Sequence, residues 1–122
     1  MSQEIAYNLN LVYAKGSVEG IPIDVTNNTI DVAGSRFVHQ VQLIGTAEEA
    51  ISLGELASLG VAAFKNLDET NYIEIRVATG GVKFLKLLPG EVWPCRLGSG
   101  VTAPFAIANT AACYLEYWIF EQ

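Results

Sequence analysis

The sequence predicts an all-β protein, an antiparallel β-sandwich that is jelly-roll-like and has about eight to nine short strands. Three observations lead to this prediction. Short runs of alternating apolar and polar residues recur along the chain, turn-forming residues separate them, and helical periodicity is almost absent. With 122 residues there is room for one domain, so we expect an N-terminal strand or docking arm at residues 1–18 and a single sandwich domain at residues 19–122.

The N-terminal segment already shows the alternation. Residues 5–13 alternate apolar residues with small or polar ones, which is typical of a half-buried strand. A turn is expected at residues 15–17 and a short strand at residues 21–25, where Pro22 favours a sheet edge or the start of the strand. Residues 26–29 contain two asparagines and are expected to form another turn.

The segment after residue 44 allows two interpretations. Thr46 and Glu49 have the spacing of a helix capping box. Glycines at positions 45 and 54 leave space for a turn or two of helix at most, so we favour a hairpin loop that runs into a strand. The expected strands of the sandwich are residues 21–25, 36–44, 50–53, 61–67, 72–77, 82–87, 91–97, 104–108 and 111–120.

Side-chain alternation assigns faces to the clearest strands. In residues 72–77, Ile73, Ile75 and Val77 are expected to point inward and Glu74 and Arg76 outward. Residues 36–44 place Phe37, His39, Val41 and Leu43 on one face and Val38, Gln40 and Gln42 on the other.

The last expected strand, residues 111–120, is apolar on both faces. Only Glu116 interrupts it. Because a small domain has one core, such a strand indicates either two packed layers or a second chain against its outer face. One face carries Cys113, Leu115, Tyr117 and Ile119, and the other carries Tyr114, Trp118 and Phe120.

The composition is poor in charge. The hydrophobic share is 51% and the charged share 16%, against a usual charged share of about 25%. This favours burial of surface against partners over a monomer coated with Ser, Thr, Asn and Gly. The net charge of −6 repels phosphate backbones and anionic lipid headgroups, so we expect no nucleic-acid partner.

No membrane partner is expected either. Residues 97–115 carry no charge, but their Gly, Pro and Asn residues would leave backbone groups unsatisfied in lipid, so we interpret them as a loop. The first residues lack the features of a signal peptide, and we expect synthesis and retention in the cytosol. Cys95 and Cys113 are then most simply reduced thiols, although a bridge between neighbouring strands stays open.

No residue pattern indicates catalysis, a metal or a cofactor. His39 is the only histidine, and one histidine with two cysteines does not readily assemble a zinc site. We therefore expect no enzyme activity, no catalytic residues, no cofactor and no metal, and a structural role for His39. Exposed aromatic residues favour a protein interface over a glycan platform, for which Trp93 and Trp118 are the candidates.

Several short motifs in the second half of the chain form a distinctive series. They are residues 66–75 (beginning Asn-Leu-Asp-Glu-Thr-Asn-Tyr), the Gly80-Gly81 hairpin, residues 85–91 (ending Pro-Gly-Glu), and residues 109–112 before the aromatic-rich last strand. Together they resemble a group of short β-rich virion proteins of tailed bacteriophages. The resemblance covers roughly residues 36–122, and the first 35 residues match nothing in it.

The resemblance implies a non-enzymatic structural protein of the phage particle, made in the host cytoplasm and located in the virion. The leading expectation is a capsid cement or decoration protein that associates with itself as a homo-oligomer, with a trimer as one option, and with the major capsid protein or another virion protein. Alternatives are a neck, tail or fibre protein, or a carbohydrate-binding sandwich module. The residues expected to form its interfaces are Tyr7, Leu9, Leu11 and Tyr13 in the arm and Tyr114, Trp118 and Phe120 in the last strand.

Overall fold

The computed structural model describes residues 4–16 and 18–122, and over these residues the chain is all β with no helix. The alternation of apolar and polar residues predicted most of the strands. They are β1 (Ile5–Lys15), β2 (Val18–Ile30), β3 (Phe37–Ile44), β4 (Glu49–Ala50), β5 (Val61–Asn66), β6 (Ile73–Arg76), β7 (Lys83–Leu87), β8 (Val92–Arg96), β9 (Phe105–Ala108) and β10 (Cys113–Phe120).

The chain divides into two compact units, Met1–Ala33 and Gly34–Gln122. The first contains strands β1 and β2, which pair with each other in a ribbon. The second contains strands β3 to β10. The division lies farther along the chain than the boundary expected after residue 18, because the residues that follow pair with β1 and not with the sandwich.

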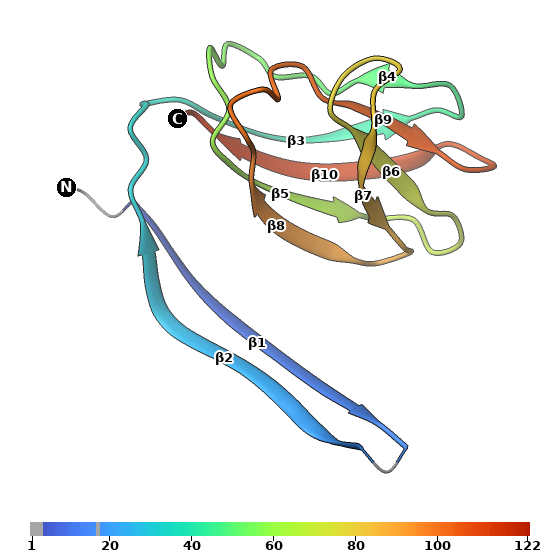
Figure 1. Cartoon of the computed structure of the whole chain (residues 1–122). Coiled ribbons are helices and arrows are strands. Elements are labelled where there is room, and N and C mark those ends of the chain that lie inside the picture. The colour runs from blue at the N-terminus through green and yellow to red at the C-terminus, as the bar shows by residue number, and fades with distance from the viewer. Residues whose placement is uncertain (1–3, 17) are drawn as a thin grey trace. The chain divides into compact units, whose positions relative to one another are not determined.

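Strands β3 to β10 form two four-stranded antiparallel sheets (Figure 1). Their strand orders are β3-β10-β5-β8 and β4-β9-β6-β7. The first and last strands of this unit are neighbours in one sheet, and the second and second-last are neighbours in the other. This is the double Greek key of a jelly roll. The fold class predicted from the sequence is confirmed.

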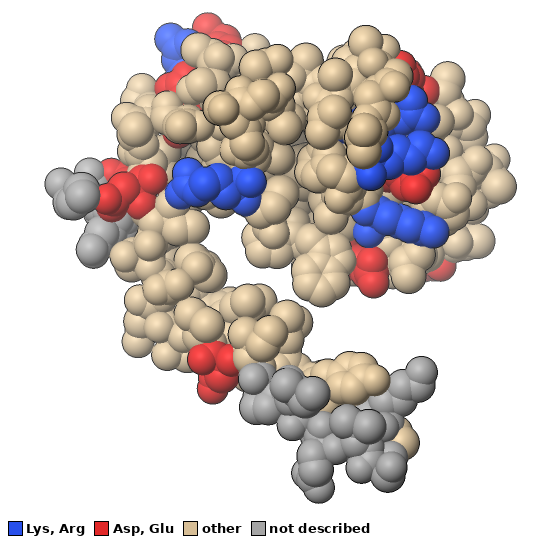
Figure 2. All heavy atoms as spheres, in the orientation of Figure 1, with Lys and Arg blue, Asp and Glu red and all other residues tan. Residues whose placement is uncertain are grey.

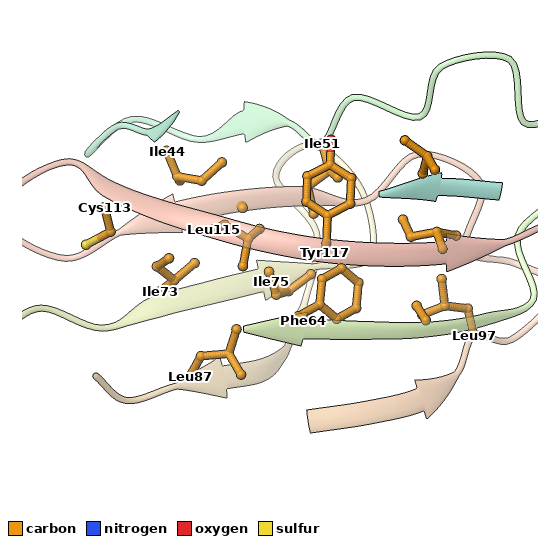
Figure 3. Packing of buried hydrophobic residues seen from close by; sticks show 14 of the residues in the cluster. Ile44, Ile51, Phe64, Ile73, Ile75, Leu87, Leu97, Cys113, Leu115 and Tyr117 are labelled. Atoms are coloured by element: carbon orange, nitrogen blue, oxygen red, sulfur yellow. The ribbon is translucent and has the colours of Figure 1, made fainter. Parts of the chain in front are cut away.

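The core lies between the two sheets and is apolar (Figure 3). Leu115 and Tyr117 of β10 point into it with Phe64 of β5 and Ile75 of β6, and none of them has exposed surface. Each such side chain contributes roughly 1.5–3 kcal/mol on full burial. The expected inward face of β6 is confirmed, since Ile73 is also fully buried.

A group of polar side chains borders the core beside β3. The Tyr117 hydroxyl donates a hydrogen bond to the Ser52 carbonyl at 2.6 Å and lies 3.0 Å from Gln40 Oε1. The Gln42 amide donates to the Ala50 carbonyl at 2.9 Å, and its oxygen accepts from the Ser52 N–H at 3.0 Å. Since Gln40 pairs with the inward-facing Tyr117, β3 turns its glutamine face toward the core side and its more apolar face outward.

The ribbon differs from the sequence prediction around its asparagines. The turn expected at residues 26–29 is wrong, because these residues lie within β2. Asn27 adopts a φ of 57°, and its N–H bonds to Asn8 Oδ1 at 2.9 Å where the register shifts. Asparagine tolerates this left-handed conformation, so it forms a bulge and the strand continues. The turn expected at residues 15–17 includes Ser17, which lies outside the described residues.

The segment after β3 contains no helix. It forms a two-residue strand, β4, that pairs with β9. The strand expected at residues 50–53 is therefore shorter and begins one residue earlier. Beyond it, the Ile51 N–H bonds to the Pro104 carbonyl at 3.0 Å, and the Ser52 N–H bonds to a side chain of β3.

Candidate interaction surface

The β3-β10-β5-β8 sheet has one face turned away from the core, which we call the outer face. On β3 and β10 it consists of four cross-strand pairs. They are Phe37 with Phe120, His39 with Trp118, Val41 with Glu116, and Leu43 with Tyr114. The face continues onto β5 and β8 through Val61, Ala63, Lys65, Val92, Pro94 and Arg96.

Large apolar side chains of the outer face are open to solvent. The exposed fraction is 65% for Phe37, 53% for Val41, 48% for Leu43 and 55% for Tyr114. The opposite face of β10 is buried in the core. The sandwich thus covers one face of this strand and leaves apolar side chains on the other face unburied, which is uncommon over such a length in a monomeric protein.

Two aromatic stacks lie on the outer face. The rings of Phe37 and Phe120 lie 5.9 Å apart with an interplanar angle of 28°. The rings of His39 and Trp118 lie 4.8 Å apart and nearly parallel, at 12°. Offset stacking of this kind contributes roughly 0.5–1.5 kcal/mol beyond area burial for an aromatic pair. Four of the eight paired side chains of β3 and β10 on this face therefore belong to stacked rings.

The charged groups of β3, β10 and β5 lie in the middle of the outer face. His39 Nε2 lies 2.8 Å from Glu116 Oε2. Lys65 is the cross-strand neighbour of Glu116 on β5. Apolar residues precede and follow this polar centre along both β3 and β10.

The two tryptophans do not form a common platform. Trp118 pairs with Ala63 on the outer face, whereas Trp93 pairs with the adjacent Phe64, whose side chain is in the core. Since successive residues of a strand point to opposite faces, Trp93 and Trp118 lie on opposite faces of the sheet.

The ribbon carries a second apolar surface, which we call the ribbon face. It consists of Ile5, Tyr7, Leu9, Leu11 and Tyr13 of β1 with Ile23, Val25, Asn28 and Ile30 of β2 paired opposite them. Tyr7, Leu11, Tyr13 and Ile23 are exposed.

The other side of the ribbon is largely polar. It includes Ala6, Asn8, Asn10 and Val12 with Asp24 and Thr29 opposite. The view in Figure 2 shows few charged side chains on the described atoms of the ribbon. A two-stranded ribbon has no interior, so the ribbon face has nothing within its own unit to pack against.

All seven residues expected at interfaces lie on these two surfaces. Tyr7, Leu9, Leu11 and Tyr13 are on the ribbon face, and Tyr114, Trp118 and Phe120 are on the outer face. Sequence reasoning did not include Phe37, Val41 and Leu43. Alternation had placed these three on one side of β3, but it does not say which side of a strand faces the core.

The motifs behind the family resemblance form hydrogen bonds within and between loops. Asn66 is fully buried, and its amide donates to the carbonyls of Asn71 at 2.8 Å and Leu87 at 3.1 Å. Its side-chain oxygen accepts from the Asp68 N–H at 2.9 Å. The Asp68 carboxylate in turn accepts from the backbone N–H of Asn71 at 2.6 Å. One buried amide thus joins the β5–β6 loop to β7.

The remaining motif residues extend this network. The Tyr72 N–H donates to Asn109 Oδ1 at 3.0 Å, and the Thr110 hydroxyl donates to Asn71 Oδ1 at 2.6 Å. The Leu88 N–H donates to Glu91 Oε1 at 2.9 Å. These residues therefore stabilise the fold where three loops meet, and the network accounts for the motifs without a ligand.

Three carboxylates have a lowered pKa because hydrogen bonds stabilise their charged form. For Glu48 the largest contribution comes from the Thr79 hydroxyl, followed by the Gly80 N–H. Backbone N–H groups lower the pKa of Asp68, with Asn71 contributing most, and that of Glu121, with Ala57 contributing most. All three hold loops or chain ends in place.

Both cysteines are free thiols, and burial raises the pKa of each. Cys95 lies on β8 and Cys113 on β10, and β5 separates these strands in the sheet. The bridge between neighbouring strands that the sequence left open is therefore not formed.

Among the described residues, no group of three or more His, Cys, Asp or Glu side chains is arranged to hold a metal ion. In the same part of the chain, no helix is long and apolar enough to cross a membrane.

No protein-family model, curated protein or solved structure matches this chain.

Proposed function

We propose that this chain is a non-enzymatic structural protein of a phage particle, most simply a capsid cement or decoration protein that works as a homo-oligomer. One observation carries the proposal: β3 and β10 lie side by side and present exposed apolar and aromatic side chains along their length. A face of this kind favours association, because covering apolar surface contributes roughly 25 cal/mol per Å².

The chemistry of the outer face supports a protein partner. Aromatic side chains are enriched in protein interfaces, and on the outer face they lie on either side of a small polar centre. His39 Nε2 lies within hydrogen-bond distance of Glu116 Oε2 on this face, so this carboxylate already has a partner. A decoration protein needs such a surface, because it associates by contact area and performs no reaction.

The phage context of the proposal rests on the motifs that resemble small virion proteins. The loop network built from Asn66, Asp68 and Asn71 gives these motifs a structural role, which is compatible with a shared fold in such proteins. The capsid is the leading location. A neck, tail or fibre location would use the same outer face.

The test combines sedimentation with particle binding. We expect the purified chain to sediment as an oligomer at micromolar concentration and to bind expanded capsids of its phage. Tyr114→Ser on the outer face should weaken both oligomer formation and capsid binding. The same replacement at Val82, which is exposed in the loop between β6 and β7, should leave oligomer formation and capsid binding unchanged. A monomer that does not bind capsids would overturn the proposal.

Labelled virions distinguish the locations. Density over the shell supports a capsid protein, and density at the neck, tail or fibres moves the protein there. A glycan array tests the remaining alternative. Because Trp93 and Trp118 lie on opposite faces of the sheet, we expect no glycan to bind through both.

A further inference from the structure

We infer that the outer face of one copy is covered by the ribbon face of a second copy, so that copies join head to tail. This rests on the proposed function, since it names the partner of the same surface. Each copy carries one ribbon and one outer face, so each surface has its match on another copy.

The two surfaces match in size. β3 and β10 have eight residues each, which at about 3.3 Å per residue is roughly 26 Å of strand. β1 has 11 residues and β2 has 13, so the ribbon reaches the full length of this pair. With strands about 4.8 Å apart, a two-stranded ribbon is as wide as two strands of the sheet. It therefore fits over β3 and β10, where the aromatic side chains are concentrated.

The two surfaces also match in chemistry. The ribbon face contains no charged side chain among its described residues, and its polar groups are the hydroxyls of Tyr7 and Tyr13 and the amide of Asn28. On β3 and β10 the outer face has its one carboxylate, Glu116, in the middle, where it already contacts His39. A tyrosine hydroxyl that lies above Glu116 could donate a hydrogen bond to it, so docking need not leave this carboxylate without a donor.

The area of each contact is modest. A ribbon footprint is about 10 Å by about 30 Å, so one contact covers on the order of 300 Å² of flat area on each partner, and side-chain relief adds to this. This is below the roughly 800 Å² per partner of a standard interface, so each contact belongs to the weaker class. Each copy takes part in two such contacts, one through its ribbon and one through its outer face.

Cysteine cross-linking between different chains tests the inference. One chain carries Leu11→Cys on the ribbon face and another, with a mass tag, carries Val41→Cys on the outer face. The two are mixed under conditions that exchange subunits and then oxidised. We expect a disulfide-linked dimer with one chain of each kind, seen as a summed mass on a non-reducing gel. Leu9→Cys and Tyr13→Cys extend the scan along the ribbon.

The matched control is Val12→Cys, since Val12 is exposed but lies on the polar side of the ribbon. It should give no cross-link to Val41→Cys. If the protein sediments as an oligomer but no ribbon-face position cross-links, the inference is wrong and the proposed function stands. If a single chain carrying both cysteines cross-links internally while mixed chains do not, the ribbon covers its own sandwich and the inference is also wrong. A monomer contradicts both proposals.

Discussion

Replacing Val41 with lysine separates the stability of the sandwich from its association. Val41 lies on the edge strand β3 and is already 53% exposed, so an isolated chain loses only about half of the roughly 1.5–3 kcal/mol that full burial provides. The new ammonium lies opposite Glu116, and an opposite-charge cross-strand pair offsets roughly 0.2–1 kcal/mol of this loss. The free energy of unfolding of the dissociated chain should therefore fall by about 1 kcal/mol or less.

The assembled state should respond far more strongly. In the assembled state the partner covers the exposed half of the Val41 side chain, and losing this burial removes about 1 kcal/mol from the free energy of association. Burying the lysine ammonium under an apolar ribbon costs at least about 2 kcal/mol more. The sum of about 3 kcal/mol per contact raises the dissociation constant by more than about a hundredfold. Sedimentation over a wide concentration range measures this shift, and urea unfolding of the dissociated chain measures stability.

A matched variant away from the outer face provides the control. Val82 is 72% exposed and lies in the loop between β6 and β7, away from the outer face. Val82→Lys should leave the dissociation constant within a factor of about two, since exposed substitutions change free energies by about 0.5 kcal/mol or less. Our reasoning is refuted if Val41→Lys assembles like the unmodified chain, or if both variants weaken assembly equally.

Three further predictions concern the sandwich itself. Asn66→Asp turns carboxylate oxygens toward two buried carbonyls in place of an amide donor, so the free energy of unfolding in urea should fall by at least about 3 kcal/mol. Asn109→Asp, which keeps its exposed acceptor, should have little effect. Because hydrogen bonds from Thr79 and Gly80 lower the pKa of Glu48, its ionised form stabilises the fold fully above the ordinary carboxyl pKa of about 4. That contribution disappears as the pH falls through the lower folded-state pKa. Glu48→Gln should flatten this part of the acid-unfolding curve, and an unchanged curve would contradict the assignment. Burial raises the pKa of the Cys113 and Cys95 thiols, so alkylation at neutral pH should be slow until denaturant is added, and rapid labelling of both in the native protein would show the burial to be wrong.

Alternation was sufficient to predict most strands of the sandwich, because the opposite sheet covers one face of each strand and leaves the other open. It failed at Asn27, where the residue type that favours a turn forms a bulge inside β2. A bulge of this kind depends on a partner strand that local sequence does not reveal. The fully buried Asn66 was likewise visible only as part of a motif, since its partners come from distant loops.

The orientation of β3 had the largest consequence for the candidate surface and was the least accessible from sequence. Phe37, Val41 and Leu43 are more hydrophobic than the glutamines between them, yet it is the glutamine face that borders the core. Gln42 is half-buried and bonds to the backbone of Ala50 and Ser52 there, so its polar groups keep hydrogen-bond partners beside the core.

This inverted strand explains why the outer face suits a specific partner. If β3 turned Phe37, Val41 and Leu43 inward, β10 alone would present aromatic side chains to solvent, in a strip one strand wide. With β3 as it is, the aromatic and aliphatic residues of two neighbouring strands form one continuous surface around the His39–Glu116 pair. Non-specific apolar contacts would bury that pair without compensation, which costs free energy. A partner with hydroxyl groups among apolar side chains, as on the ribbon face, avoids the cost, so the polar centre selects its partner while the surrounding rings supply the affinity.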